Sequence, residues 1–182
     1  MIDKIKSANL SEREKIFAEV DKYIDFLATP NEAFSGFAPC PFVYTERSSG
    51  KLKYEIQLFG DMTSIFVKIE EWDEDDAYDS MIIAHLGGVR WDEQKSFQHF
   101  LNKELRLRKM DYIKCICFHP DDPFSVDGVA PRMKAPYYLV NVAYRDMLAK
   151  AHESLKPTKY FDNFTEENKK YLKVEVPKSG GP

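Results

Sequence analysis

Three short apolar segments, each stopped by glycine or proline, constrain the fold of this chain most. Residues 52–59 alternate apolar and polar side chains between two glycines, and residues 80–86 form an apolar run that ends at a glycine pair. Residues 112–118 form a third run, which stops where Pro120 follows His119, because proline cannot donate to a strand ladder. Segments of this length with such ends predict β-strands.

Amphipathic segments separate these strands. In residues 11–28, apolar side chains recur every three or four positions, and the stretch from Asp92 to Lys109 shows the same helical spacing. Pro136 suits the first turn of a helix, so a further helix is predicted from there through Leu148. Strands that alternate with helices predict an α/β fold, here a single domain with a mixed sheet of about four to five strands and helices packed on it.

Two stretches are harder to assign. Residues 40–46 contain Pro41, which allows only an edge or entering strand. Residues 61–76 fit a strand and a helix equally, since Ile65 and Ile69 belong both to an alternating pattern and to one helical face.

Length and charge limit the class of protein. The 182 residues suffice for one domain, expected over 1–155, and a C-terminal extension over 156–182 whose last residues are flexible. The net charge is −4 without a long block of like charge, which argues against a nucleic-acid partner. The longest apolar runs fall short of the roughly 20 residues of a membrane-spanning helix, so no membrane partner is expected.

The cysteine count bears on the compartment. Three cysteines, an odd number, do not make a disulfide framework, and the first residues show no secretory signal. We therefore expect free cysteines and a cytoplasmic location. A small-molecule ligand is the expected partner, and assembly into a homo-oligomer stays open.

The stretch 115–124 concentrates chemically active side chains. If it begins as a strand, Cys115, Cys117 and His119 share one face, but residues four apart in a strand lie roughly 13 Å apart, too far to bind one zinc ion together. His119 could act as acid, base or ligand of a divalent transition metal, with Asp121 orienting its ring or joining it as a ligand. The alternatives are cysteines that only pack in the core and a turn stabilised by local hydrogen bonds of the aspartates.

Cys40 is a second candidate, because prolines on both sides fix its backbone. Its thiol is a nucleophile if a neighbouring base or cation activates it, and otherwise a buried sulfur in a rigid turn. The pair Gly87-Gly88 is only a weak signal for phosphate binding, and His85 is expected to be a core or surface residue.

The order of the polar motifs resembles a known family. Cys40-Pro41-Phe42 follows an N-terminal helix, Phe118-His119-Pro120-Asp121 comes some eighty residues later, and Ala135-Pro136-Tyr137 follows. In this pattern the chain resembles domain of unknown function 1415, over about residues 13–150. The resemblance implies that Cys40, His119 and Asp121 are the matching polar positions, and it supplies no established activity.

The chain departs from that family at two places. Met133-Lys134 stands where the family has an asparagine and an arginine, and Asn141 stands where a histidine is expected. The family's stretch before the second motif is apolar without cysteines, which favours a packing role for Cys115 and Cys117.

These observations predict a small-molecule enzyme of unknown reaction, metal-assisted or redox. Its pocket is expected to bring Cys40, His119 and Asp121 together as catalytic residues, with His119 and Asp121 as the metal ligands if a metal is bound. Three further side chains are expected to bind the substrate, with the first holding an anionic group: Lys134, Tyr137 and Phe124.

The alternative is a non-catalytic interaction or structural module. In that case the prolines only shape loops, and an aromatic-rich tail docks on a partner or a second copy through Tyr160, Phe161, Phe164 and Tyr171.

Overall fold

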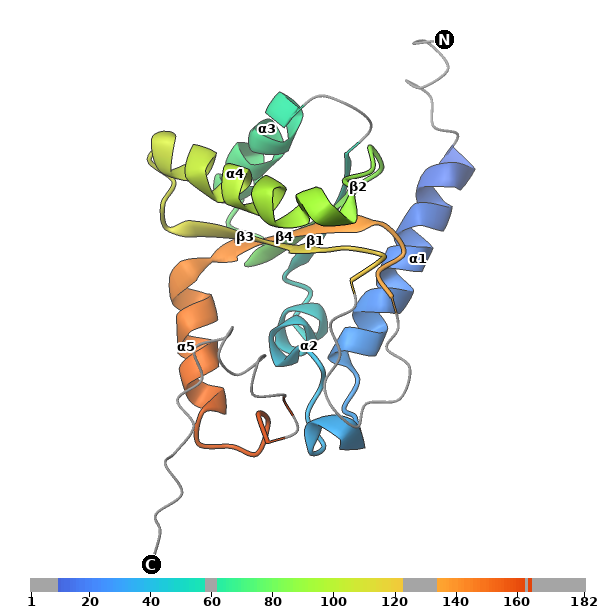
Figure 1. Ribbon diagram of the computed structural model, residues 1–182, viewed down its shortest axis with the longest axis vertical. Coiled ribbons are helices and arrows are strands. Elements are labelled where there is room, and N and C mark those ends of the chain that lie inside the picture. Colours follow the sequence, from blue (N-terminus) through green and yellow to red (C-terminus); the bar gives the residue numbers. More distant parts are fainter. Residues whose placement is uncertain (1–9, 58–61, 123–133, 163, 165–182) are drawn as a thin grey trace, which may run out of the picture.

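The computed structural model describes residues 10–57, 62–122, 134–162 and 164, and it shows a four-stranded sheet with helices on both faces (Figure 1). The elements are α1 (Leu10–Ala28), α2 (Pro41–Ser48), β1 (Leu52–Gln57), α3 (Met62–Asp73), β2 (Ser80–His85), α4 (Gln94–Leu107), β3 (Ile113–Phe118), β4 (Tyr138–Tyr144) and α5 (Arg145–Leu155), with 3-10 turns at Glu32–Phe34 and Trp91–Glu93. The predicted α/β domain with a mixed sheet is confirmed. Among the described residues, no helix has both the length and the apolar character needed to cross a membrane.

The sheet has the strand order β1-β2-β4-β3. β1 is parallel to β2, whereas β4 is antiparallel to both of its neighbours, β2 and β3. β1, β2 and β3 therefore run in the same direction, and their carboxyl ends meet at one end of the sheet. In open α/β sheets, ligands usually bind beyond these strand ends.

Two cores lie on opposite faces of the sheet. Figure 1 shows α3 and α4 on one face and α1, α2 and α5 on the other. Side chains of β2 and β4 alternate between the two cores, because successive residues of a strand point to opposite faces. Met81, Ile83 and Val140 pack under α3 and α4, whereas Ile82 and Leu139 pack against α1.

A third, smaller core holds the start of the C-terminal extension. Tyr160, Phe161 and Phe164 are buried against Phe34 and Leu155, and the Tyr160 hydroxyl donates a hydrogen bond of 2.6 Å to the Pro39 carbonyl oxygen. These three aromatic residues are thus occupied within their own chain, which argues against docking of these side chains on a partner, and the interaction-module alternative stays a prediction. Tyr171 lies outside the described residues.

Residues 61–76, which fitted two patterns, form a helix over Met62–Asp73. Ile65, Phe66, Ile69 and Trp72 are all buried at helical spacing, and that whole face packs into the core above the sheet. The segment is helical because a helix buries the indole ring of Trp72 together with the aliphatic side chains.

The prediction of a strand over 40–46 is wrong, because Pro41–Ser48 is helix α2. Pro41 occupies the first helical turn, where its missing N–H is not needed, and Cys40 precedes it in an extended conformation. Val43 and Glu46 are the buried residues of this short helix. A proline at a helix start and one at a strand entry give the same sequence signal.

The helix predicted from Pro136 through Leu148 is also wrong in its first half. Residues Tyr138–Tyr144 form β4, and the helix begins only at Arg145. Six of the seven residues of β4 are buried, because the strand lies between two others and is covered on both faces. A strand buried on both faces shows no alternation, so its apolar positions also match a helical face.

Side chains of α4 cover the free edge of β3. Asn102 donates to the Cys115 carbonyl oxygen at 2.9 Å and accepts from the Cys115 amide at 3.1 Å. Gln98 accepts from the Cys117 amide at 2.7 Å, and Gln94 donates to the Cys117 carbonyl oxygen at 3.0 Å. These side chains lie four residues apart on one face of the helix and satisfy backbone groups that no strand pairs with.

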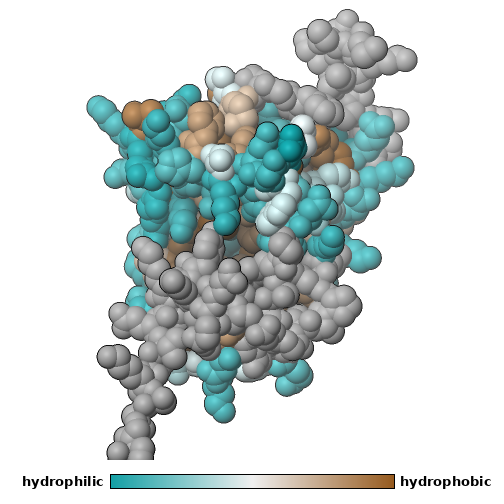
Figure 2. Space-filling model, viewed as in Figure 1, coloured by the Kyte–Doolittle hydropathy of each residue, from teal (hydrophilic) through white to brown (hydrophobic). Residues whose placement is uncertain are grey.

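On the side of the molecule that Figure 2 shows, the described surface is mostly hydrophilic.

Asn102→Ala tests this edge cover. The substitution removes both hydrogen bonds to Cys115 and leaves a half-buried amide and carbonyl without partners, so we expect a loss of about 1–3 kcal/mol in the free energy of unfolding. Urea unfolding followed by circular dichroism measures this change. Lys103→Ala, on the exposed side of the same helix, is the control and should change stability by less than about 0.5 kcal/mol. Equal effects of the two variants would contradict the role of Asn102.

Candidate functional site

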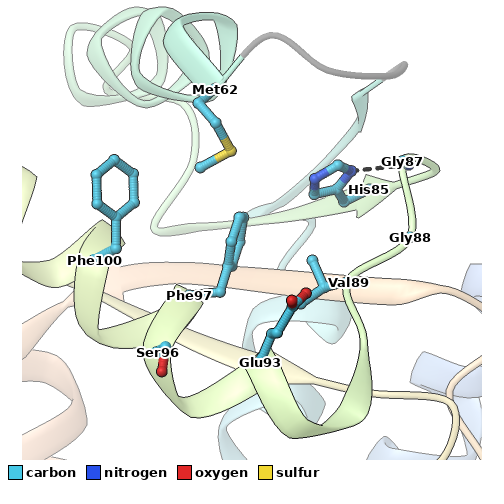
Figure 3. Close-up of a pocket in the computed structure, with 9 residues that line it drawn as sticks. All are labelled: Met62, His85, Gly87, Gly88, Val89, Glu93, Ser96, Phe97 and Phe100. Carbon is cyan, nitrogen blue, oxygen red and sulfur yellow. Dashed lines mark hydrogen bonds between the residues drawn. The ribbon is translucent and has the colours of Figure 1, made fainter.

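A cavity of about 510 Å³ lies where β2 ends, at the carboxyl-terminal end of the sheet (Figure 3). Its walls come from the start of α3, the loop after β2 and the first half of α4. The lining residues are mostly apolar, with a few polar groups among them: Met62, His85, Gly87, Gly88, Val89, Glu93, Ser96, Phe97 and Phe100. The size is that of a site for a small organic molecule.

The His85 ring is held by the backbone that follows it. As the last residue of β2, His85 accepts a hydrogen bond of 3.0 Å at Nδ1 from the Gly87 amide. An acceptor at Nδ1 requires that the proton of the neutral ring sits on Nε2. Figure 3 shows Nε2 on the side of the ring away from Gly87, toward Met62 and Phe97.

Burial lowers the pKa of His85, because a charged imidazolium would lose its hydration. The ring therefore offers a neutral N–H group to the cavity at pH 7. Nε2 has no hydrogen-bond partner within the described part of the chain.

Gly87 is required for this geometry. A Cβ atom at this position would lie 2.5 Å from Cε1 of His85, well inside van der Waals contact. Any other residue would displace the ring, so the glycine fixes the direction in which Nε2 points.

A row of aromatic rings supports His85 from below. His85 lies directly opposite Tyr138 in the pairing of β2 with β4, with ring centroids 6.1 Å apart. Phe97 of α4 contacts both rings, at 5.7 Å from His85 and 5.4 Å from Tyr138. The Tyr138 hydroxyl lies beside the Cys117 thiol, and burial raises the pKa of Tyr138. These rings leave the imidazole little freedom to turn.

His119 lies behind the cavity wall rather than in it. Its Nε2 donates a hydrogen bond of 2.6 Å to the Val89 carbonyl oxygen, and its Nδ1 accepts one of 2.9 Å from the Asp121 amide. The ring also contacts Trp91 and Tyr138, with centroids 5.4 and 5.7 Å away. His119 thus ties the end of β3 to the loop that carries Val89, and both of its nitrogens are used.

The structure gives no support to a metal bound by His119 and Asp121. The Asp121 carboxylate lies 4.0 Å from Nδ1 and its side chain is 73% exposed, whereas that of His119 is 5% exposed. Nδ1 already accepts a backbone hydrogen bond, so its lone pair is not free for an ion. Among the described residues, no three histidine, cysteine or acidic side chains are grouped so that they could hold a metal ion.

Cys40 lies on the opposite side of the sheet from His119. It precedes α2 and packs against the core beneath α1, whereas His119 contacts Tyr138 in the core beneath α3 and α4. The structure therefore does not form the shared pocket that the sequence predicted. The residue is partly exposed but its thiol is enclosed, and burial raises the pKa of Cys40 to about 11.

Of the predicted substrate-binding residues, the two that the structure describes, Lys134 and Tyr137, do not line the cavity. Lys134 is exposed, and the Tyr137 hydroxyl donates a hydrogen bond to Glu19 of α1, on the same side of the sheet as Cys40. Phe124 lies outside the described residues. That Lys134 holds an anionic group stays a prediction.

The packing alternative for the two strand cysteines is confirmed. Cys115 and Cys117 are buried in the core under α4, and burial raises both pKa values, that of Cys117 to about 12. All three cysteines are free.

Sequence reasoning passed over His85, although a signal was present. His85 ends an apolar strand directly before a glycine pair, just as His119 ends one before Pro120. Both rings accept at Nδ1 from the amide two residues further on. The sequence could not show which ring keeps its second nitrogen free. That depends on the Val89 carbonyl oxygen, which lies in the loop after β2 and accepts from His119, thirty residues later in the chain.

Comparisons of the chain with protein-family models, with curated proteins and with solved structures found no match. The resemblance to domain of unknown function 1415 therefore stays a prediction.

The state of His85 can be measured directly. Long-range ¹H–¹⁵N correlation spectra should show the neutral ring with its proton on Nε2 at pH 7 and a pKa below 6.5. Because this pKa is lower than in the unfolded chain, the corresponding stability is present above pH 6.5 and is lost as the pH falls below it. Gly87→Ala should abolish the tautomer preference, since it displaces the ring. A proton on Nδ1 in the unmodified protein would contradict this arrangement.

The reactivity of Cys40 provides a second test. With a pKa of about 11, only about 0.03% of this thiol is ionised at pH 7.5, so iodoacetamide should alkylate it about 100-fold more slowly than an ordinary exposed cysteine. The rate should rise about tenfold per pH unit between pH 8 and 10. Mass spectrometry of timed samples measures this, with protein unfolded in guanidinium as the control. Rapid labelling of folded protein at neutral pH would instead indicate an activated thiol.

Proposed function

We propose that this protein binds a small, neutral organic molecule in the cavity at the end of β2. One observation carries the proposal: the Nε2–H group of His85 faces a cavity whose walls are otherwise mainly apolar and aromatic. Sites for small molecules commonly combine such walls with a few fixed polar groups. The three free cysteines fit a reducing compartment, and we propose a cytoplasmic location on that ground.

The polar groups of the cavity suggest the chemistry of the ligand. His85 offers a hydrogen-bond donor without charge, which suits a carbonyl oxygen or a ring nitrogen. Glu93, the residue directly before α4, brings an acceptor, and it disfavours an anionic ligand by like-charge repulsion. Phe97 and Phe100 provide flat apolar contacts. A neutral heteroaromatic molecule or an amide, with an acceptor and a donor on neighbouring atoms, meets these requirements.

The same geometry supports an enzyme that acts on a carbonyl group. A fixed N–H donor can stabilise negative charge that develops on a carbonyl oxygen. His85 is not the base in such a reaction, because its only free nitrogen carries the proton. Glu93 is the acidic side chain among the lining residues and would take that role. A redox or nucleophilic reaction at Cys40 is not part of this proposal, since its thiol lies across the sheet.

A fragment screen by NMR tests the binding proposal. Neutral heteroaromatic amides should shift the signals of His85, Gly87, Gly88 and Phe97, and His85→Phe should weaken the best binder about 3- to 10-fold, the value of one neutral hydrogen bond. His99→Phe is the matched control, because His99 is exposed on α4 and does not line the cavity. Binding that is unaffected by His85→Phe, or shifts that map to another region, would contradict the proposal.

A further inference from the structure

The two edge strands of the sheet, β3 and β1, differ in how their outward backbone groups are hydrogen-bonded. α4 side chains cover the backbone of β3, whereas no described residue hydrogen-bonds to the outward backbone groups of β1. The carbonyl oxygens of Lys51 and Gln57 accept from the β2 side, so the odd-numbered residues between them face β2. The N–H and C=O groups of Leu52, Tyr54 and Ile56 therefore point away from the sheet.

A hollow beside β1 keeps this edge accessible. It has a volume of about 570 Å³ and lies between β1 and one side of α1, where Phe17, Ala18 and Asp21 line it. Leu52 and Tyr54 lie on the face that packs toward α1, and Lys53 lies on the other face with Tyr78. An edge strand whose outward N–H and C=O groups have no partner among the described residues is a template for pairing with another strand.

The sequence of β1 is suited to pairing with itself. Around Tyr54, residues 52–56 read Leu-Lys-Tyr-Glu-Ile, which places an apolar residue at each end and opposite charges next to the centre. In an antiparallel pair centred on Tyr54, Leu52 faces Ile56 of the second copy, and Lys53 faces Glu55 of the second copy. Like residues and opposite charges thus meet at every position.

The outward backbone groups of β1 also fit this pairing. In an antiparallel pair, hydrogen-bonded positions alternate with positions that are not hydrogen-bonded. Centring the pair on Tyr54 makes Leu52, Tyr54 and Ile56 the hydrogen-bonded positions, and these are the residues whose backbone groups point outward. Lys53 and Glu55 then occupy the other positions, where the Cα atoms are only about 4.5 Å apart.

Charges on α3 and in the turn after it add further opposite-charge pairs to the proposed contact. Lys53 pairs with Asp75 at 3.6 Å, and Glu55 pairs with Lys68 at 3.2 Å. Self-pairing joins these into a row of alternating charge, which runs Asp75, Lys53, Glu55 of the second copy and Lys68 of the second copy. A row of alternating charges favours one register over a shift of one residue, which would break every charge pair.

We propose that two copies of this chain associate through antiparallel pairing of their β1 strands, which joins the two four-stranded sheets into one sheet of eight strands. This interface is independent of the cavity at the end of β2, so its failure would leave the proposed ligand site untouched. The partner is identified by the self-complementary strand and its charges.

Cross-linking tests the register of the pairing. Proteins carrying K53C or E55C are mixed and oxidised mildly, and a disulfide-linked dimer should form only in the mixture. The two substituted positions face each other about 4.5 Å apart, whereas the same position in the two copies lies on a diagonal, beyond about 7 Å, where a disulfide does not form. Equal cross-linking of each variant alone, or none in the mixture, would overturn the proposal.

Charge reversal tests the strength of the association. In sedimentation velocity experiments over a concentration series, the unmodified chain should dimerise, K53E and E55K should each weaken the dimer at least tenfold, and the double variant K53E/E55K should restore it. The double variant loses the same internal pairs with Asp75 and Lys68 as the single variants, so rescue identifies the contact between copies. Circular dichroism confirms that each variant is folded. A monomer at every concentration up to about 0.1 mM, or a double variant no better than the single ones, would overturn the proposal.

Discussion

The burial of β2 and β4 on both faces is the constraint on which the rest of this structure depends. Because neighbouring residues of these strands enter different cores, the sheet divides the interior into two compartments that exchange no side chains. Two polar side chains can therefore meet only if they lie on the same face of the sheet, and for a strand residue that face follows from its position in the alternating pattern. His85, Tyr138 and His119 share the compartment under α3 and α4, whereas Cys40 belongs to the other.

Within one compartment, a single backbone contact separates two similar histidines. Both end a strand, and both accept at Nδ1 from the amide two residues later. The Val89 carbonyl oxygen occupies Nε2 of His119, while Nε2 of His85 faces the cavity. His119 thereby becomes part of the scaffold, and the Val89 loop that it fixes forms one wall of the site around His85. The structural and the candidate functional histidine differ in surroundings rather than in local sequence.

The sequence predicted the elements whose pattern is local. The amphipathic helices α1 and α4 and the strands that end at glycine or proline, β1, β2 and β3, are confirmed because spacing and end residues determine them. It failed at α2 and β4, where Pro41 and a fully buried strand send signals that fit two structures. The candidate site was missed for a related reason. Linking Cys40 to His119 required knowing on which face of the sheet each lies, and the strand order that decides this rests on long-range pairing.

A crystal structure with a bound fragment tests most directly whether His85 is a neutral donor inside a ligand cavity. We expect density for a neutral heteroaromatic amide between Met62 and Phe97, with an acceptor atom within about 3.2 Å of His85 Nε2 and with Nδ1 still bonded to the Gly87 amide. A cavity closed by side chains, or an imidazole whose Nε2 hydrogen-bonds to its own chain while the fragment binds elsewhere, would contradict it.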